Sequence, residues 1–403
     1  MTASRSRSAD PLLSRVDRVA RALRLAERSA ELDTTPAFPV AEFRALAAGG
    51  LVGPRTPVSL GGVGLSARDA GRLLGRLAYR SGTTFAKLAL QPEFCSVLAD
   101  HGSKELVDRY FRPLVRGELL VGNQVTEPTA GSDAGAIELR AEPTTKGYRL
   151  SGTKSEVAFA QDAHAAIVYG RVDGAPAGPE GITAFLVPQD LPGIRREVLS
   201  DLGERWMRRG TVRYDGVPIP SALRIGEEGA AFRYLKDELT RERALLAAIY
   251  LGVGRASWEE TVRHVGRRTA FGRTLSAQQA VAFPLVEDWA RLDAADLFVD
   301  RALAAIDAGE DSAASAALGK WMATDTALTA IDHAIQFHGG RGYSKALPHE
   351  QRWRDVRSGA IAHGPSEIML LVASRSLWPR PEKPGAPSRS PRRGRTHPTA
   401  QRS

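Results

Sequence analysis

Cysteine is nearly absent from this chain, which has a single one, Cys95, among 403 residues. One thiol excludes an intramolecular disulfide, and the apolar neighbours of Cys95 indicate a core residue rather than a nucleophile. No metal site is predicted. No segment approaches the ~18 apolar residues that span a bilayer, and the first ten residues lack the apolar stretch of a signal peptide. We therefore expect no membrane association and a cytoplasmic location.

Acidic residues are scarce at the C-terminal end. The formal net charge is +9, and the segment from Arg380 to Ser403 holds six arginines and one lysine against one glutamate. This tail, rich in Pro, Ser and Arg, cannot bury enough apolar surface to order itself, so residues 379–403 are predicted to be disordered. No aromatic residues stand between the basic ones, so no nucleic-acid partner is expected. Weak attachment to an acidic partner is the alternative role of the tail.

The remaining chain divides into three regions by the spacing of its apolar residues. Over residues 11–116 they recur at helical spacing, which predicts an N-terminal helical domain. Residues 117–229 contain short runs such as AAIVYGRV, punctuated by Gly and Pro, as is typical of a compact β domain. Over residues 230–378 long Ala- and Leu-rich segments predict a helical bundle.

The segment TEPTAGSD, residues 126–133, follows a β-rich run that covers residues 119–125. A turn of Thr, Pro, Gly and Ser offers backbone N–H groups and hydroxyls to a polar ligand at close range. By itself the segment is also compatible with a well-capped loop that binds nothing.

Further motifs remove most of that ambiguity. They are SLGGVGLS (59–66), LSGTK (150–154), GITAFLVP (181–188), LGERWMRRGTVRYDGVPIP (202–220), RRTAFGRTLSAQQAV (267–281) and QFHGGRGYSKALPHEQRWRDVR (336–357). In this order and spacing, together with TEPTAGSD, they resemble the acyl-CoA dehydrogenase family from about Leu13 to Ser376. The resemblance implies an N-terminal α-helical domain, a middle β-barrel or sandwich domain, a C-terminal four-helix bundle and an FAD cofactor.

The resemblance also assigns residues to the cofactor. Flavin contacts are implied for Val125, Thr126, Gly131, Ser132, Glu156, Ala158, Arg268, Phe271, Gln279, Gln336 and Gly340. In the family the last five reach the cofactor of a neighbouring subunit, which implies a homodimer or homotetramer. Glu156 and Ala158 depart from the family, which usually has an aromatic and a hydroxyl residue there. One flavin hydrogen bond is therefore expected to be missing or supplied by backbone.

The catalytic base is the larger departure. Many family members carry a glutamate in a Tyr-Glu-Gly-Thr turn, whereas residues 362–365 read AHGP here. A second family solution places the glutamate on a helix before an arginine, and Glu242-Arg243 matches it. Glu242 also continues the apolar spacing of Leu235, Leu239, Leu246, Ile249 and Val253. Burial on that face would raise its pKa toward the range useful for proton abstraction.

Both candidate bases have alternative interpretations. Glu242 could form an ion pair with a basic residue of another helix. His363 could be the base itself or only line the pocket, and Gly364-Pro365 predicts that the last helix starts with Pro at its first position. The positive end of that helix would then favour the neutral imidazole.

The predicted activity is FAD-dependent α,β-dehydrogenation of an acyl thioester. Glu242 would remove the α-proton while the β-hydrogen leaves as hydride, with Ser132 and Arg243 contacting the substrate. The thioester could be formed with coenzyme A or with an acyl carrier protein. The electron acceptor could be an electron-transfer flavoprotein or oxygen. A flavin monooxygenase or oxidase on the same fold and a non-catalytic scaffold are the rival hypotheses.

Overall fold

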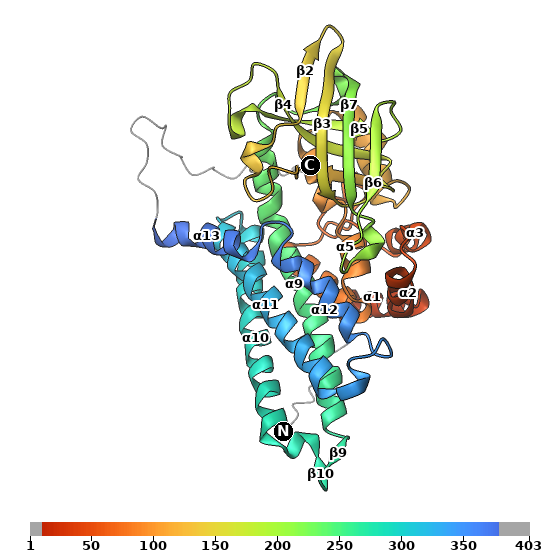
Figure 1. The fold of residues 1–403 in the computed structure, drawn as a ribbon, viewed down its shortest axis with the longest axis vertical. Helices are drawn as coiled ribbons and strands as arrows, with labels where there is room; N and C mark the ends of the chain where they lie inside the picture. The colour runs from red at the N-terminus through yellow and green to blue at the C-terminus, as the bar shows by residue number, and fades with distance from the viewer. Residues whose placement is uncertain (1–9, 379–403) are drawn as a thin grey trace, which may run out of the picture.

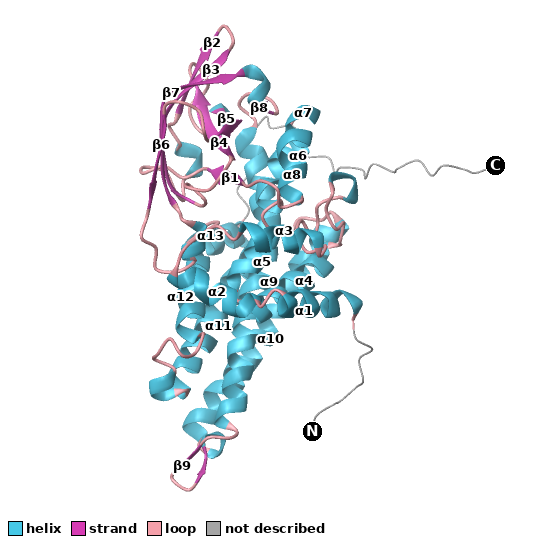
Figure 2. Cartoon of the chain, turned by 90° about the vertical axis from the view of Figure 1, so that its right-hand side faces the viewer, coloured by secondary structure: helices cyan, strands magenta, loops and turns pink. Residues whose placement is uncertain are grey.

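The computed structural model describes residues 10–378 and arranges them as an elongated helical body with a β domain at one end (Figures 1 and 2). The prediction of disorder for 379–403 lies outside the described residues. Within 10–378, none of the helices has the length and apolar character needed to cross a membrane. Cys95 is buried, in agreement with its predicted place in the core.

The N-terminal part consists of helices α1 (Pro11–Ala22), α2 (Leu25–Thr34), α3 (Val40–Ala48), α4 (Ala67–Ser81), α5 (Thr83–Ala89), α6 (Ser96–His101), α7 (Lys104–Leu106) and α8 (Arg112–Val115). Side-chain caps fix several of their starts. The Asp10 carboxylate accepts from the Leu12 N–H, and the Ser66 hydroxyl accepts from the Asp69 N–H. Helix α4 ends at Gly82, whose φ of 72° suits glycine.

The middle part forms an eight-stranded sheet. Its strands are β1 (Val121–Gln124), β2 (Arg140–Thr144), β3 (Gly147–Val157), β4 (Ala165–Val172), β5 (Ile182–Pro188), β6 (Ile194–Val198), β7 (Gly210–Pro220) and β8 (Arg224–Ile225). The order is β6-β7-β3-β2-β4-β5-β8, and β1 pairs in parallel with β4. The predicted run at 119–125 is therefore a shorter strand, β1, with a loop after it.

Strand β4 connects the β domain to the helical body. Its side chains alternate between the two faces of the sheet, because successive residues of a strand point to opposite sides. Ala166 and Val168 pack in the core of the β domain, whereas Ile167 and Tyr169 belong to the core shared with the helices. Burial on both faces explains why this strand reads as a nearly continuous apolar run.

The C-terminal part contains α9 (Ala231–Val265), α10 (Gln279–Ala308), α11 (Ala313–Phe337), α12 (His349–Arg357) and α13 (Ser366–Leu377). A hairpin of β9 (Thr269–Ala270) and β10 (Arg273–Thr274) joins α9 to α10 at the end far from the β domain (Figure 1). Helix α13 begins at Ser366 with Pro365 as its N-cap. The prediction of Pro365 at the first helical position was thus wrong by one residue.

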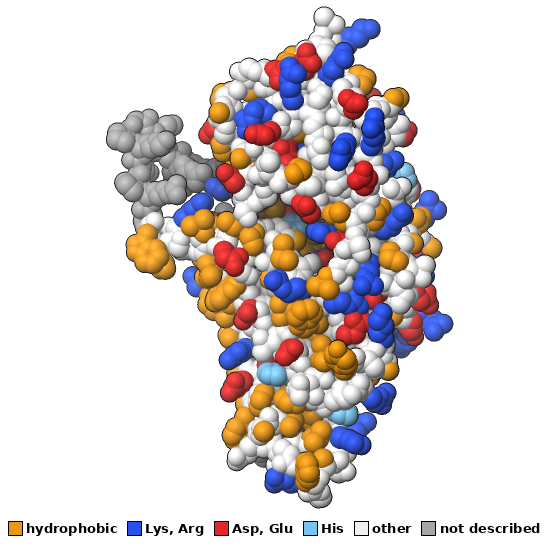
Figure 3. All heavy atoms as spheres, in the orientation of Figure 1, with side chains coloured by type: hydrophobic (Ala, Val, Ile, Leu, Met, Phe, Trp, Pro, Cys, Tyr) orange, Lys and Arg blue, Asp and Glu red, His pale blue; other side chains and the backbone are white. Residues whose placement is uncertain are grey.

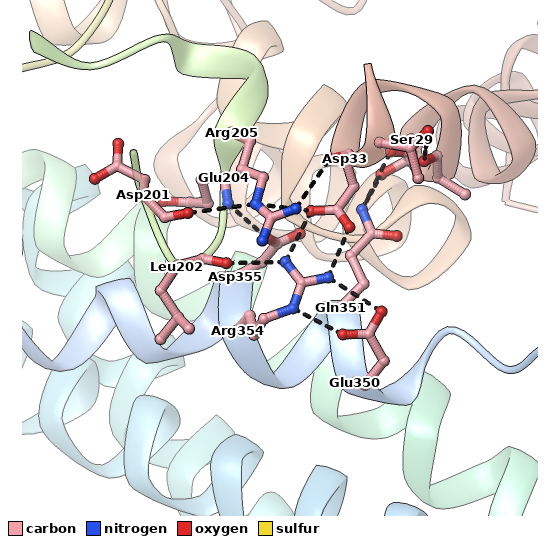
Figure 4. A network of polar contacts seen from close by, with 12 residues as sticks. Ser29, Asp33, Asp201, Leu202, Glu204, Arg205, Glu350, Gln351, Arg354 and Asp355 are labelled. Carbon is pink, nitrogen blue, oxygen red and sulfur yellow. Dashed lines mark hydrogen bonds and ion pairs between the residues drawn. The ribbon is translucent and has the colours of Figure 1, made fainter. Parts of the chain in front are cut away.

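A polar junction links the three parts of the chain (Figure 4). Arg354 of α12 makes a two-pronged contact with Asp33 of α2, at 2.8 and 2.6 Å, and donates to the carbonyl of Leu202 at 3.0 Å. The Glu204 N–H donates to the carboxylate of Asp355 at 2.6 Å. Leu202 and Glu204 lie between β6 and β7, so the junction joins the N-terminal helices, the β domain and the bundle.

Removing the guanidinium from this junction should destabilise the protein. Arg354→Met leaves the Asp33 carboxylate, which is 6% exposed, with only the longer contact to Arg205 Nε at 3.9 Å. Breaking such a pair from one side typically costs about 3–5 kcal/mol of unfolding free energy. Denaturant unfolding should show this loss, whereas Arg375→Met, an exposed arginine of α13, should change stability little. Equal stability of Arg354→Met and the parent protein would contradict a linking role for Arg354.

Candidate active site

Glu242 lies on the half of α9 that meets the β domain and is buried, with 2% of its surface exposed. Its Oε2 atom is 3.5 Å from Nε2 of His363, and its Oε1 atom has no hydrogen-bond partner. The structure thus brings the two candidate bases into contact. Within residues 10–378, no lysine or arginine forms an ion pair with Glu242, so the alternative of a cationic partner on another helix is not observed.

Burial acts on both members of this pair. It raises the pKa of Glu242 well above its usual range, and the neighbouring Glu238 raises it further. Burial also lowers the pKa of His363 well below its usual range, and Lys320, Lys87 and Arg243 add to this effect. Both shifts favour the uncharged forms, so the contact is between a neutral imidazole and a carboxyl that keeps its proton to unusually high pH.

The turn that carries His363 is held through its carbonyl groups. Arg243 Nε donates to the carbonyl of His363 at 3.0 Å, and Lys320 Nζ donates to the carbonyl of Gly364 at 2.7 Å. His363 has a φ of 56°, which is unusual for a residue with a side chain. The Phe94 ring stacks on the imidazole with a centroid distance of 5.0 Å. The neutral state expected for His363 is therefore explained by burial and nearby cations.

Sequence reasoning missed several buried ionisable groups beside this pair. Glu238 precedes Glu242 by one helical turn, and Glu93 lies in the segment before α6. Burial raises the pKa of Glu238 to about 8 and that of Glu93 to about 7. Lys320 is 1% exposed, and burial lowers its pKa to about 7. The four-residue spacing from Glu242 was a usable signal for Glu238, whereas nothing local distinguishes Glu93 or Lys320.

The loop after β1 is fixed from behind by a buried ion pair. Lys154 Nζ donates to the carbonyl of Val125 at 2.7 Å and to Glu127 Oε1 at 2.8 Å. The Ser155 N–H donates to the carbonyl of Thr126 at 3.0 Å. Glu127 in turn accepts from two backbone N–H groups, at 138 and 139. The start of TEPTAGSD is therefore held in place by a buried ion pair and by backbone hydrogen bonds.

The exposed side of the same loop is open. Gly131 and Ser132 are exposed, and a Cβ atom added to Gly131 would meet nothing within 4 Å. Glu156 is also exposed and has a φ of 50°, at a register shift between β3 and β7. Its carboxylate accepts from the Ser155 hydroxyl at 2.9 Å, and Ala158 is half-buried. A polar ligand can approach this surface without moving the strands.

The other predicted cofactor residues lie at the far end of the bundle. Arg268, Phe271, Gln279, Gln336 and Gly340 are all exposed. The Phe271 side chain is 98% exposed and sits in the hairpin that follows α9 (Figure 1). The part of α9 from Glu242 to its last residue is about 35 Å long at 1.5 Å per residue. One chain therefore does not bring these five residues to the loop at Thr126.

The chain runs from helices through a β domain to a helical bundle, with a buried carboxyl on α9 and an open loop after β1. Residues 12–118, 122–217 and 229–378 match the N-terminal, middle and C-terminal domains of acyl-CoA dehydrogenase, respectively. The chain belongs to the acyl-CoA dehydrogenase family, as its motifs predicted, and the predicted fold is confirmed.

Individual relatives support the same assignment. Benzylmalonyl-CoA dehydrogenase of Aromatoleum aromaticum is 34% identical over 88% of this chain and 94% of its own length. The human mitochondrial short-chain specific acyl-CoA dehydrogenase is 31% identical over 87% and 85%, respectively. The structure of PigA with FAD and proline superposes with a TM-score of 0.86 at 26% identity, covering 94% of this chain and 99% of PigA.

Proposed function

We propose that this protein uses FAD to dehydrogenate the Cα–Cβ bond of an acyl thioester, with Glu242 as the base. The observation that carries the proposal is the Glu242 carboxyl, which is buried, has a raised pKa and keeps Oε1 without a partner. An unpaired buried carboxyl costs folding free energy and is typical of functional sites. Similarity to relatives named for acyl-CoA substrates supports the thioester.

The residues of the open loop suit a flavin. Val125, Thr126, Gly131 and Ser132 would hold FAD from the side opposite the Lys154 ion pair, where backbone and hydroxyl groups are accessible. Bound FAD would supply the acceptor for the β-hydride. The exposed Glu156 offers a carboxylate where the family usually has an aromatic residue, and the half-buried Ala158 offers no hydroxyl, so only backbone groups can supply the hydrogen bond expected there.

The chain's own contribution is the proton transfer. The thioester carbonyl acidifies the α-hydrogen, and the Glu242 carboxylate removes it as a proton. Arg243 serves the substrate indirectly, because its Nε atom holds the carbonyl of His363. His363 lines the same place in its neutral form, where it contacts the carboxyl and limits access of water. Ser132 lies on the exposed loop, where it can contact both the flavin and the substrate.

A homo-oligomer would complete the cofactor site. The exposed residues Arg268, Phe271, Gln279, Gln336 and Gly340 would reach the FAD of a neighbouring subunit. Figure 3 shows hydrophobic side chains gathered over the helical bundle. On α10 the exposed large apolar side chains are Phe283, Val286, Trp289 and Leu297. Their spacing places most of them on one face of the helix, which suits burial against a second copy.

The remaining partners follow from the chemistry. An electron-transfer flavoprotein or oxygen would take the electrons, and the thioester would be carried by coenzyme A or an acyl carrier protein. We place the protein in the cytoplasm. A monooxygenase or oxidase is the second candidate, favoured by the AHGP turn at 362–365 that lacks the usual glutamate. The hypothesis of a non-catalytic scaffold does not account for the buried Glu242 carboxyl and its raised pKa.

The first test removes the proposed base. Glu242→Gln should keep FAD and bind thioester, yet lose roughly 10²- to 10⁴-fold in the rate of flavin reduction, the usual size of a general-base contribution. His363→Ala is the matched comparison and should cost much less. Anaerobic stopped-flow bleaching of the flavin band measures both rates. The reverse ranking would assign the proton to His363, and no effect of either substitution would favour the monooxygenase.

The second test is the pH profile of flavin reduction. The raised pKa means that Glu242 holds its proton to higher pH than free glutamate, and only the carboxylate can act as base. The rate at saturating thioester should therefore rise with pH, with its midpoint well above the ordinary glutamate pKa. This step should vanish in Glu242→Gln. A rate that falls as pH rises would rule out a carboxylate base.

The third test concerns the neighbour's cofactor site. Arg268→Ala should weaken FAD retention, because an arginine paired with pyrophosphate is a strong charge-assisted contact. Arg267→Ala removes an adjacent exposed arginine and should retain FAD. Flavin content after gel filtration, combined with light scattering, measures retention and mass together. A flavin-saturated monomer, or equal retention in both variants, would contradict the shared site.

A further inference from the structure

Two buried lysines contact the two ends of the segment that carries His363. Lys87 of α5 contacts the start of the segment, where its Nζ atom donates to the hydroxyl of Ser358 at 3.3 Å. Lys320 of α11 contacts the end, where its Nζ atom donates to the carbonyl of Gly364 at 2.7 Å. Lys87 and Lys320 are 4% and 1% exposed, respectively. The segment is therefore held at both ends by a lysine that is shielded from water.

The two lysines differ in their partners. Lys87 pairs with Glu204, which also accepts from the Ser358 hydroxyl at 2.7 Å. In the described part of the chain, no carboxylate forms an ion pair with Lys320, and the charges that act on it are those of the cations Arg243 and Lys87. A buried lysine in such surroundings costs folding free energy and is a candidate for a functional role. Its hydrogen bond to the turn is the contact that can account for its presence.

The turn that Lys320 holds has a strained backbone. His363 has a φ of 56° and Gly364 a φ of 93°, so two successive residues have positive φ. A Cβ atom at Gly364 would lie 2.7 Å from Cε of Met369 and 3.1 Å from Nη2 of Arg243. Strained backbone persists where the surrounding structure over-determines it. The donors from Lys320 and Arg243 to the two carbonyls of the turn supply such contacts.

We propose that Lys320 is a positioning residue for the Glu242 base: its hydrogen bond to the turn sets how the His363 imidazole lies against the Glu242 carboxyl. The inference rests on the dehydrogenase function proposed above and adds a residue that acts through the turn. Nε2 of the imidazole lies 3.5 Å from Oε2 of Glu242, and the Phe94 ring stacks on the imidazole. Relaxation of the turn would displace the imidazole, and reactions between positioned groups are slowed by small displacements.

The charge of Lys320 adds a second effect. Burial is the main cause of the lowered pKa of His363, and Lys320 is the cation that contributes most, ahead of Lys87 and Arg243. Without that charge, His363 would take up a proton at higher pH. An imidazolium 3.5 Å from Glu242 would favour the carboxylate and so lower the pKa of Glu242. The other charged groups that act on Glu242 stay in place: Glu238, Arg241, Arg243 and Glu93.

Two substitutions separate the hydrogen bond from the charge. Lys320→Met removes both, whereas Lys320→Gln removes the charge and keeps an N–H donor. At high pH and saturating butyryl-CoA, flavin reduction in the FAD-loaded oligomer should slow about threefold to tenfold in Lys320→Met, the effect of one hydrogen bond, and less in Lys320→Gln. In both variants the pH midpoint of the rate should be lower than in the parent protein. Lys236→Met, at an exposed lysine of α9, is the control and should keep the rate and the midpoint.

A double-mutant cycle tests whether Lys320 acts through His363. In the His363→Ala background, Lys320→Met should change the rate by less than about twofold, because the imidazole that Lys320 positions is gone. A residue that only supports folding would lower the rate by the same factor in both backgrounds. It would also leave the pH midpoint unchanged, since a smaller folded fraction scales the rate equally at every pH.

Nuclear magnetic resonance gives a readout that needs no substrate. The chain has eight histidines, and in protein with isotope-labelled histidine the signal lost in His363→Ala belongs to His363. At high pH, where the imidazole is neutral, this signal should shift in Lys320→Met, because the imidazole moves relative to the Phe94 ring. In both Lys320 variants it should titrate at higher pH than in the parent protein.

The outcomes separate this inference from the proposed function. Unchanged signals and pH midpoints, equal rate losses in both backgrounds, or loss of FAD from both Lys320 variants would overturn the inference. If butyryl-CoA still bleaches the flavin of the parent protein, the dehydrogenase function then stands without it. If the His363 signal responds as expected but butyryl-CoA does not bleach the flavin, Lys320 positions the turn and the proposed reaction fails for this thioester.

Discussion

The contact between Arg354 and Asp33 is the constraint on which the geometry of the rest depends. Arg354 belongs to the C-terminal bundle, Asp33 to the N-terminal helices, and the Leu202 carbonyl that Arg354 also binds belongs to the β domain. Glu242 lies in the bundle, whereas the loop at Thr126 lies in the β domain. A shift between these parts would change the distance from Glu242 to that loop, and reactions between positioned groups tolerate little misplacement.

The buried ionisable groups near Glu242 are separated by type: basic side chains contact the turn at 363–364, and carboxyls lie on α9. The cations Lys320 and Arg243 hold the carbonyls of the turn at 363–364, and they add to burial in lowering the pKa of His363, which favours the neutral imidazole. The carboxyls Glu238 and Glu242 lie one helical turn apart on α9, and burial, with a further contribution from Glu238, raises the pKa of Glu242 so that it keeps its proton until the pH rises well above the usual range of a glutamate. The cations and the carboxyls do not pair with each other. Lys320 and Arg243 donate to backbone carbonyls, and Oε1 of Glu242 has no hydrogen-bond partner.

Sequence reasoning succeeded where the information is local. Helical spacing and short apolar runs predicted the α-β-α order, and the four-residue and three-residue steps around Glu242 predicted a buried carboxyl. Glu93 and Lys320 escaped detection because their burial depends on elements distant in the chain: Lys320 comes from α11 to the turn at 364. The start of the last helix was displaced by one residue at Pro365, since a Pro before Ser fits both the cap and the first turn.

The length of α9 explains why the predicted cofactor residues fall into two groups, one in the β domain and one at the far end of the bundle. The helix places Glu242 at the β domain and the hairpin containing Phe271 about 35 Å further along, where its side chain is 98% exposed. Phe271 also has a φ of 52°, and within a single chain its exposed side chain makes no apolar burial that would offset this backbone strain. Its exposure and its strained backbone make sense if a second subunit covers it. The same rigid helix would then carry the base for one site and present cofactor contacts to another, so that assembly and catalysis depend on one element.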